Sequence, residues 1–150
     1  MTKWEIAVIK VKKAIAKKKY KYSQTAYTHI LIGLKKLYVR HDCSGYVSAA
    51  LQYLGIKGFI TSSAGFSNNS NVAFILKNHN FTKLKFIGWE DCKKGDIISA
   101  SGAHVEIFDH YSDGVAYVYS NGSTIGLANP SFGKDGGEHK YDTIWRYIGK

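Results

Sequence analysis

Two residue types that organise many small proteins are scarce in this chain, which has two cysteines (Cys43 and Cys92) and one proline (Pro130) among its 150 residues. Two cysteines are too few for a disulfide scaffold, and neither lies in a Cys-x-x-Cys pair or in a His/Cys cluster spaced like a zinc site. We therefore expect a fold that packing alone holds together, with no metal and no cofactor.

Long apolar runs are also absent. Residues 1–20 carry lysines among their apolar positions, and no later stretch is apolar enough to cross a bilayer. The sequence therefore predicts neither a signal peptide nor a membrane span. A disordered chain is excluded as well, because 45% of the residues are hydrophobic and 14% are aromatic. Since there is no internal repeat and no linker, residues 1–150 form one predicted domain, which we expect to be a monomer.

Acidic residues are few: 11 Asp and Glu stand against 21 Lys and Arg, which gives a formal net charge of +10. Such an excess predicts attraction to polyanions such as nucleic acid, anionic lipid or the teichoic acids of a Gram-positive cell wall. Charge alone identifies only this class of partner.

The apolar residues that are present change their spacing along the chain. Helices are expected over residues 4–15 and 26–38, from Cys43 to a stop at Gly55, and over residues 70–76 after a polar turn at residues 62–71. Strands are expected over residues 81–87, 96–100, 103–109, 115–121 and 143–148. Helices that precede an antiparallel sheet indicate the α+β class.

Cys43 lies where the third of these helices begins, between Asp42 and Ser44. Asp42 is a good N-cap, and the dipole and free backbone N–H groups of a helix N-terminus favour a thiolate in the first turn. Gly45 leaves room for the close approach of another group. These features indicate a nucleophile. The alternative is a small buried hydrophobe, which describes most free cysteines, and these residues alone leave both readings open.

A nucleophilic cysteine needs a base, usually a histidine that is near in space rather than in sequence. Of the six histidines, His104 is the best candidate, because it begins a predicted strand at the rim of the sheet. Glu106 shares its face of the strand but lies two residues along, so we expect it farther from the reaction or on the surface. The other histidines are expected to be structural or exposed.

Three motifs resemble those of the NlpC/p60 family of bacterial cell-wall cysteine peptidases, which belongs to the papain-like superfamily. They are DCSGYV at residues 42–47, KKGDII at residues 93–98 and GAHVEIF at residues 102–108. Residues 14–23 and 143–150 are similar to the entry segment and the closing strand of that family. The resemblance implies a papain-like fold, with N-terminal helices packed on a C-terminal antiparallel sheet and the nucleophile at a helix N-terminus.

The resemblance also implies roles for individual residues. Cys43 would be the nucleophile and His104 the base. Tyr20 would lie near the thiolate and the oxyanion, and Asp42 and Ser44 would help to bind the amino end of a peptide substrate.

The third catalytic residue, which orients the base, would be Asn121 or Ser120, and strand alternation allows only one of them to face His104. Asn121 also has a structural reading, because Asn-Gly is a common turn pair. The chain departs from the family pattern at Lys19, where a proline is usual, and residues 23–40 lack the usual glycine pair. These departures put the substrate preference in question.

The substrate implied by the resemblance is the stem peptide of peptidoglycan, cut between D-Glu and the diamino acid or, alternatively, at the N-acetylmuramoyl-L-alanine amide. The positive charge would hold the protein on anionic wall polymer such as teichoic acid. The expected site of action is the bacterial cell wall, reached from a phage particle, through a phage lysis system or as part of a longer protein.

Two other classes remain open. An acyltransferase of the same superfamily would use the same cysteine and histidine, but it should show a membrane-anchoring segment. A basic binding module for wall polymer or nucleic acid would explain the charge and the 11 tyrosines. The sequence shows no such anchoring segment, and a binding module does not explain residues 42–45 occurring together with His104, so nucleic acid is the less favoured partner.

Overall fold

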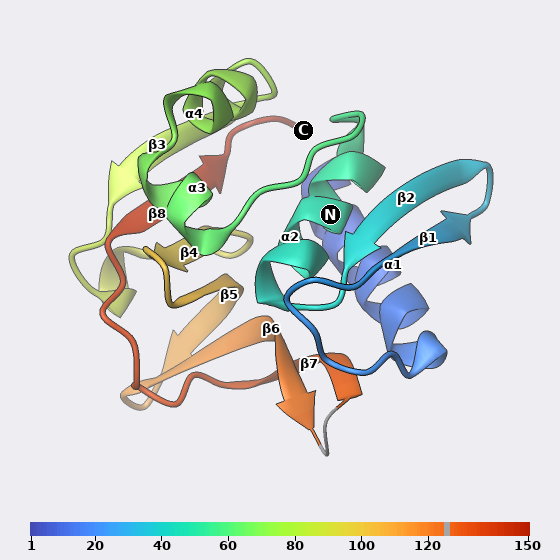
Figure 1. Cartoon of the computed structure of the whole chain (residues 1–150). Helices are drawn as coiled ribbons and strands as arrows, with labels where there is room; N and C mark the ends of the chain where they lie inside the picture. The colour runs from blue at the N-terminus through green and yellow to red at the C-terminus, as the bar shows by residue number, and fades with distance from the viewer. Residues whose placement is uncertain (125–126) are drawn as a thin grey trace.

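A computed structural model describes residues 1–124 and 127–150, and this part of the chain is an α+β protein, as the sequence predicts (Figure 1). Its helices are α1 (Lys3–Lys18), α2 (Cys43–Leu54), α3 (Ser63–Asn68) and α4 (Ser70–Lys77), with a 3-10 turn η1 (Trp89–Asp91). Its strands are β1 (Tyr27–Ile32), β2 (Lys35–Arg40), β3 (Phe81–Lys85), β4 (Ile97–Ala100), β5 (His104–Ser112), β6 (Val115–Thr124), β7 (Leu127–Lys134) and β8 (Thr143–Tyr147).

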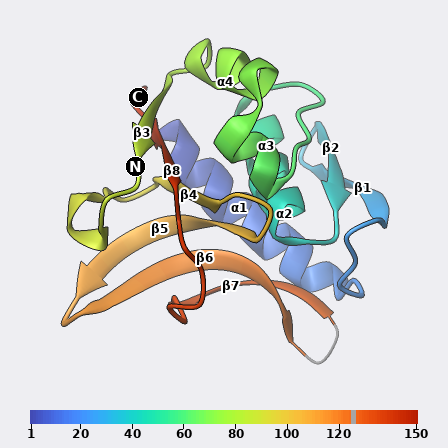
Figure 2. The same cartoon turned by 60° about the vertical axis from the view of Figure 1, so that its left-hand side comes forward.

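Six of the described strands form one antiparallel sheet in the order β3-β8-β4-β5-β6-β7. Figure 2 shows it as a curved layer with α1 and α2 on one side. Because α2 contacts β5 and β6, the helix lies against inner strands of the sheet. The main hydrophobic core fills the space between these helices and the sheet, and a smaller cluster around Phe108 and Ile144 covers the opposite face.

The first helix is amphipathic, as its spacing predicts. Thr2 caps α1, and its apolar stripe is buried against α2 and the sheet. The indole N–H of Trp4 donates to the carbonyl of Gly95 at 2.7 Å, which fixes the helix to the turn before β4. The buried stripe consists of Trp4, Ala7, Val8, Val11 and Ile15.

The helix expected over residues 26–38 is wrong, because this segment forms the hairpin β1–β2. Residues 27–32 are largely β-branched or aromatic, which favours a strand, and Gly33 makes the turn at φ 60. Helix α2 also provides hydrogen bonds to the backbone of β2. The side chain of Gln52 accepts from the N–H of Tyr38 and donates to its carbonyl, both at 2.9 Å. The spacing of apolar residues within 26–38 cannot predict this contact with Gln52.

Two further elements differ from expectation. The polar turn predicted at residues 62–71 contains α3, and its Asn69 caps α4. Strand β7 is not among the expected strands, and it contains Pro130. The strand lies at the edge of the sheet, where a missing N–H is tolerated.

Candidate active site

The start of α2 holds the candidate nucleophile. Asp42 is the N-cap, and its Oδ1 accepts from the N–H of Gly45 at 2.8 Å. Cys43 follows as the first helical residue and is half-buried. The thiol therefore lies at the positive end of the helix dipole.

Gly45 is required at this position because the chain turns tightly before the helix. A Cβ placed on Gly45 would lie 1.8 Å from the carbonyl oxygen of Arg40, which belongs to the backbone and cannot move aside. We expect Gly45→Ala to destabilise the fold by about 3 kcal/mol or more, measured as the free energy of unfolding in urea. Gly133→Ala is the matched control, because a Cβ there meets nothing within 4 Å. Equal stability of the two variants would contradict this packing.

His104 begins β5 and reaches Cys43 from the sheet. Burial acts to lower the pKa of His104, but hydrogen bonds and charge from Cys43 and Glu106 outweigh it and raise the pKa to about 10. The structure thus brings together the two side chains that the sequence singles out as nucleophile and base. Their contact joins the first residue of α2 to the first residue of β5.

The other contacts of the ring bear on which residue orients it. His104 Nε2 lies 3.0 Å from Glu106 Oε1 and 3.0 Å from Ser120 Oγ. These contacts leave Nδ1 as the ring nitrogen available to the thiol. Asn121 lies elsewhere: its Nδ2 donates to the carbonyl of Asp42 at 2.9 Å and so fastens β6 to the start of α2. Of the two predicted third residues, Ser120 is therefore the one that contacts the base.

Of the two places expected for Glu106, the surface is excluded, since Glu106 is only 2% exposed, and its contact with His104 puts it behind the base. Burial is the main cause that raises the pKa of Glu106 to about 7, with help from Asp135, whereas His104 acts to lower it. Glu106 Oε2 has no donor among the described residues, so a proton between Glu106 and Asp135 would satisfy both carboxyls. Burial acts to raise the pKa of Asp135, but its hydrogen bonds to Glu106 and Tyr141 lower it overall.

The segment between β7 and β8 completes the surroundings of the base. The ring of His139 stacks on the ring of His104, with 4.9 Å between centroids. The hydroxyl of Tyr141 donates to Asp135 Oδ2 at 2.6 Å. Sequence reasoning missed these residues, since they lie in polar loop-like segments that carry no local signal.

Tyr22, rather than the predicted Tyr20, adjoins the thiol. Burial is the main cause that raises the pKa of Tyr22 to about 12, and the charge of the neighbouring Cys43 adds to it. Tyr22 therefore stays protonated at neutral pH and remains a potential donor. The ring of Tyr20 instead stacks on His41, with 4.1 Å between centroids.

A cleft of about 270 Å³ opens beside Cys43. Asp42 and Ser44 line it but are only 5% and 2% exposed, because the side chain of Arg40 binds both of them. The complete lining is Gln24, Arg40, Asp42, Cys43, Ser44, Ser62, Ser63, Ala64, Gly102 and Ala103. The lining is mainly small and polar, which suits an extended peptide better than an apolar ligand.

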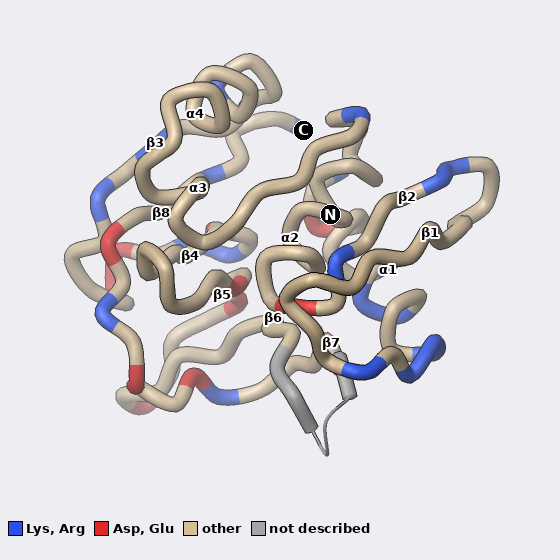
Figure 3. The backbone as a smooth tube through the Cα atoms, in the orientation of Figure 1, with Lys and Arg blue, Asp and Glu red and all other residues tan. Residues whose placement is uncertain are grey.

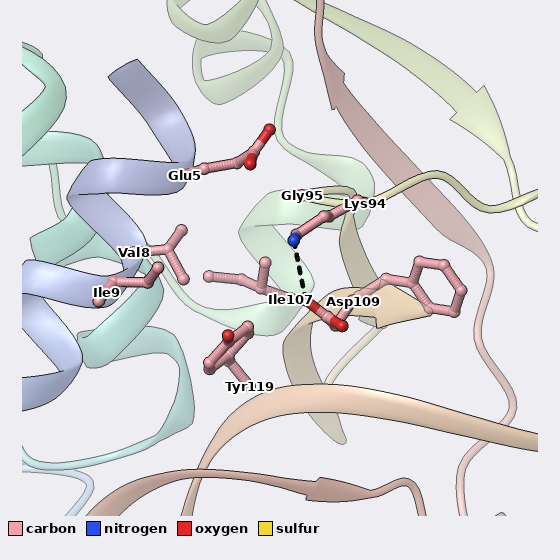
Figure 4. Close-up of a pocket in the computed structure, with 9 residues that line it drawn as sticks. Glu5, Val8, Ile9, Lys94, Gly95, Ile107, Asp109 and Tyr119 are labelled. Atoms are coloured by element: carbon pink, nitrogen blue, oxygen red, sulfur yellow. Dashed lines mark ion pairs between the residues drawn. The ribbon is translucent and has the colours of Figure 1, made fainter. Parts of the chain in front are cut away.

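A second cavity, between α1 and the sheet, is too small to compete with this cleft. Figure 4 shows its lining, with Lys94 directed toward Asp109 at 3.7 Å. The cavity measures about 20 Å³, which is room for one water molecule.

Cys92 is a half-buried turn residue. It follows η1, and its thiol donates to the carbonyl of Gly88 at 3.5 Å. Burial is the main cause that raises the pKa of Cys92 to about 12, so this thiol is a weak nucleophile.

No group of three or more His, Cys, Asp or Glu side chains among the described residues could hold a metal ion. No helix in the same part of the chain has the length and apolarity needed to span a membrane. Comparisons of the chain with protein-family models, with curated proteins and with solved structures likewise found no match.

Proposed function

We propose that this protein is a papain-like cysteine peptidase that cuts an amide bond in the stem peptide of bacterial peptidoglycan, between D-Glu and the diamino acid. The observation that carries the proposal is the contact between Cys43, at a helix N-terminus, and His104, whose pKa is raised to about 10 by Cys43 and Glu106 despite its burial. A thiol and an imidazole held in this way form the pair that nucleophilic amide hydrolysis needs. The choice of substrate comes from the resemblance of residues 42–47 and 102–108 to the NlpC/p60 family.

In the proposed reaction the Cys43 thiolate attacks the amide carbonyl carbon and forms a tetrahedral intermediate. His104 then gives its proton to the leaving amine as the C–N bond breaks, which leaves a thioester on Cys43. Water attacks the thioester while His104 takes a proton from it. The acid product leaves, and the thiolate and the protonated imidazole are restored.

The oxyanion of the intermediate would be held by the backbone N–H of Cys43 and the hydroxyl of Tyr22. We expect Tyr22→Phe to lower the rate by about 10²-fold, because one donor to the developing negative charge is lost. Tyr20→Phe is the matched control and should change the rate little, since Tyr20 stacks on His41. The rate of clearing of a cell-wall suspension measures both variants, and a larger loss in Tyr20→Phe would contradict the assignment.

Basic side chains support binding to an anionic wall. Figure 3 shows Lys and Arg at the C-terminal end of α1 and on β2, which lie on the same side of the molecule. The exposed lysines of these two segments include Lys17, Lys18, Lys19, Lys35 and Lys36. Teichoic acid would be attracted to this side by long-range electrostatics.

The proposed function is tested by incubating the protein with purified Gram-positive cell walls and identifying the released fragments by mass spectrometry. Cleavage after D-Glu is expected to expose a new amino group on the diamino acid. Release of intact stem peptides that begin with L-alanine would instead indicate the amidase alternative. Walls that bind the protein and release no fragment would contradict both enzymatic readings and favour a binding module.

A further inference from the structure

The charges in the cleft beside Cys43 come from two of its lining residues, Arg40 and Asp42. The carboxylate of Asp42 already accepts hydrogen bonds from the protein at both of its oxygens. Its Oδ1 accepts from the N–H of Gly45 at 2.8 Å and from the hydroxyl of Ser44 at 3.2 Å, and both carboxylate oxygens accept from Arg40 Nε at 3.0 Å. The carboxylate is therefore buried, and its hydrogen bonds go to the protein rather than to a ligand.

Arg40 is placed differently, since its side chain is 14% exposed and lines the cleft. Its Nη2 donates to Ser44 and, at 3.3 Å, to the carbonyl of Thr61. Its Nη1 donates to the hydroxyl of Tyr27 at 3.4 Å. A guanidinium has five N–H groups, and these contacts, with the one to Asp42, use four of them. One Nη1 hydrogen therefore has no partner among the described residues.

We propose that Arg40 makes this cleft select a substrate that carries a carboxylate beside the scissile amide, and disfavour one that carries an ammonium group there. A guanidinium recognises carboxylates through charge-assisted hydrogen bonds, and its weak hydration favours such pairing in a partly buried site. For its substrate the inference rests on the proposed function. A glutamate linked through its γ-carboxyl keeps a free α-carboxylate close to the bond that is cut, whereas the amidated form of that residue has a neutral carboxamide.

The electrostatic part of the proposal can be tested without any hydrolysis. Iodoacetate and iodoacetamide alkylate thiols and differ in one negative charge, and mass spectrometry of peptides reports the rates at Cys43 and Cys92 separately. We expect Arg40→Gln to lower the iodoacetate-to-iodoacetamide rate ratio at Cys43 by about tenfold, because a positive charge is removed from the lining of the same cleft. Arg40→Lys keeps the charge and should keep the ratio.

Arg146→Gln is the control for loss of one positive charge elsewhere, since Arg146 also pairs with a buried carboxylate, that of Asp96. It should leave the ratio at Cys43 unchanged. If Arg40→Gln does not fold, the wild type still tests the proposal, because added salt should lower the ratio at Cys43. An unchanged ratio at Cys43 in Arg40→Gln, or in wild type with added salt, would overturn the proposal.

The substrate part is tested with two synthetic stem peptides that differ only in the α-carboxylate or α-carboxamide of the γ-linked glutamate. We expect the wild type to cut the carboxylate form about tenfold faster, and Arg40→Gln to cut both at similar rates. If the wild type cuts both equally, the selectivity is overturned and the proposed function stands. If it cuts neither, the proposed function fails, and the alkylation ratio still decides whether the cleft attracts anions.

Discussion

Replacing Cys43 with alanine is expected to lower the rate of cell-wall clearing by about 10⁴-fold or more, because the sulfur that forms the thioester beside His104 is removed. Binding to the walls should be unchanged, since the basic side chains on α1 and β2 are untouched. The loss of turbidity of a wall suspension measures hydrolysis, and sedimentation of the protein with the walls measures binding.

Cys92→Ser is the matched control for the loss of a thiol. The pKa of Cys92 is raised to about 12, chiefly by burial, and its sulfur donates to a backbone carbonyl, so we expect this variant to keep its full activity. If Cys43→Ala clears walls as fast as the wild type, Cys43 is a buried structural residue and the peptidase reading is wrong. If neither the wild type nor the variant clears walls but both bind, the protein is a binding module.

Glu106→Gln is expected to lower the rate by about 10²-fold or more, because the base loses the charged partner that orients its ring and stabilises its protonated form. Glu106 Oε1 lies 3.0 Å from His104 Nε2, and glutamine preserves the shape of the side chain while removing the charge. Ser120→Ala removes the other contact of the same nitrogen, a neutral one, and should cost less. A larger effect of Ser120→Ala would make Ser120 the orienting residue instead.

The pH dependence of the rate gives the same assignment an independent test. Although burial acts to lower it, the pKa of His104 is raised to about 10 by Cys43 and Glu106, so the imidazole stays protonated until the pH approaches that value. Burial raises the pKa of Glu106 to about 7, so its charge is lost as the pH falls through that value. We therefore expect the wild-type rate to be highest between about pH 7 and about pH 10.

In Glu106→Gln both limits should change. Without the carboxylate charge, His104 loses its proton at a lower pH, so the alkaline fall in rate should move downward. The fall near pH 7 should disappear, because glutamine does not titrate. A variant that is slower but has the wild-type pH profile would show that Glu106 acts only by packing.

The start of α2 could be predicted from the sequence because its signals are local. An N-cap side chain at Asp42, an apolar stripe and a terminating glycine at Gly55 all depend on residues within the helix or beside it. The strand that begins at His104 was equally readable from its alternation. The α+β class follows from the order of such segments, and the described structure agrees with it.

The parts that could not be predicted depend on residues far apart in the chain. The segment at residues 26–38 looks helical by spacing alone, but Gln52 of α2 satisfies the backbone of Tyr38 and favours a strand. The resemblance assigns Tyr20 to the place beside the thiol, but the path of the chain past the start of α2 brings Tyr22 next to Cys43 instead.

The residues around His104 could not be predicted for the same reason, because they come from distant parts of the chain. The position of Glu106 along β5 allows a place behind the base or on the surface, and only the enclosing strand and the segment that holds Asp135 decide for the first. Arg40 carried no signal at all in the sequence. Its importance appears only when its guanidinium is seen to bind Asp42 and Ser44 at the edge of the cleft.

The most direct test of the central claim, that Cys43 is the nucleophile, is a titration of the wild-type protein with iodoacetamide in which wall clearing and the modification of each cysteine are followed together. We expect activity to fall in proportion to the fraction of Cys43 that is alkylated, while Cys92 is still unmodified. Full activity in protein whose Cys43 is completely alkylated would contradict the claim.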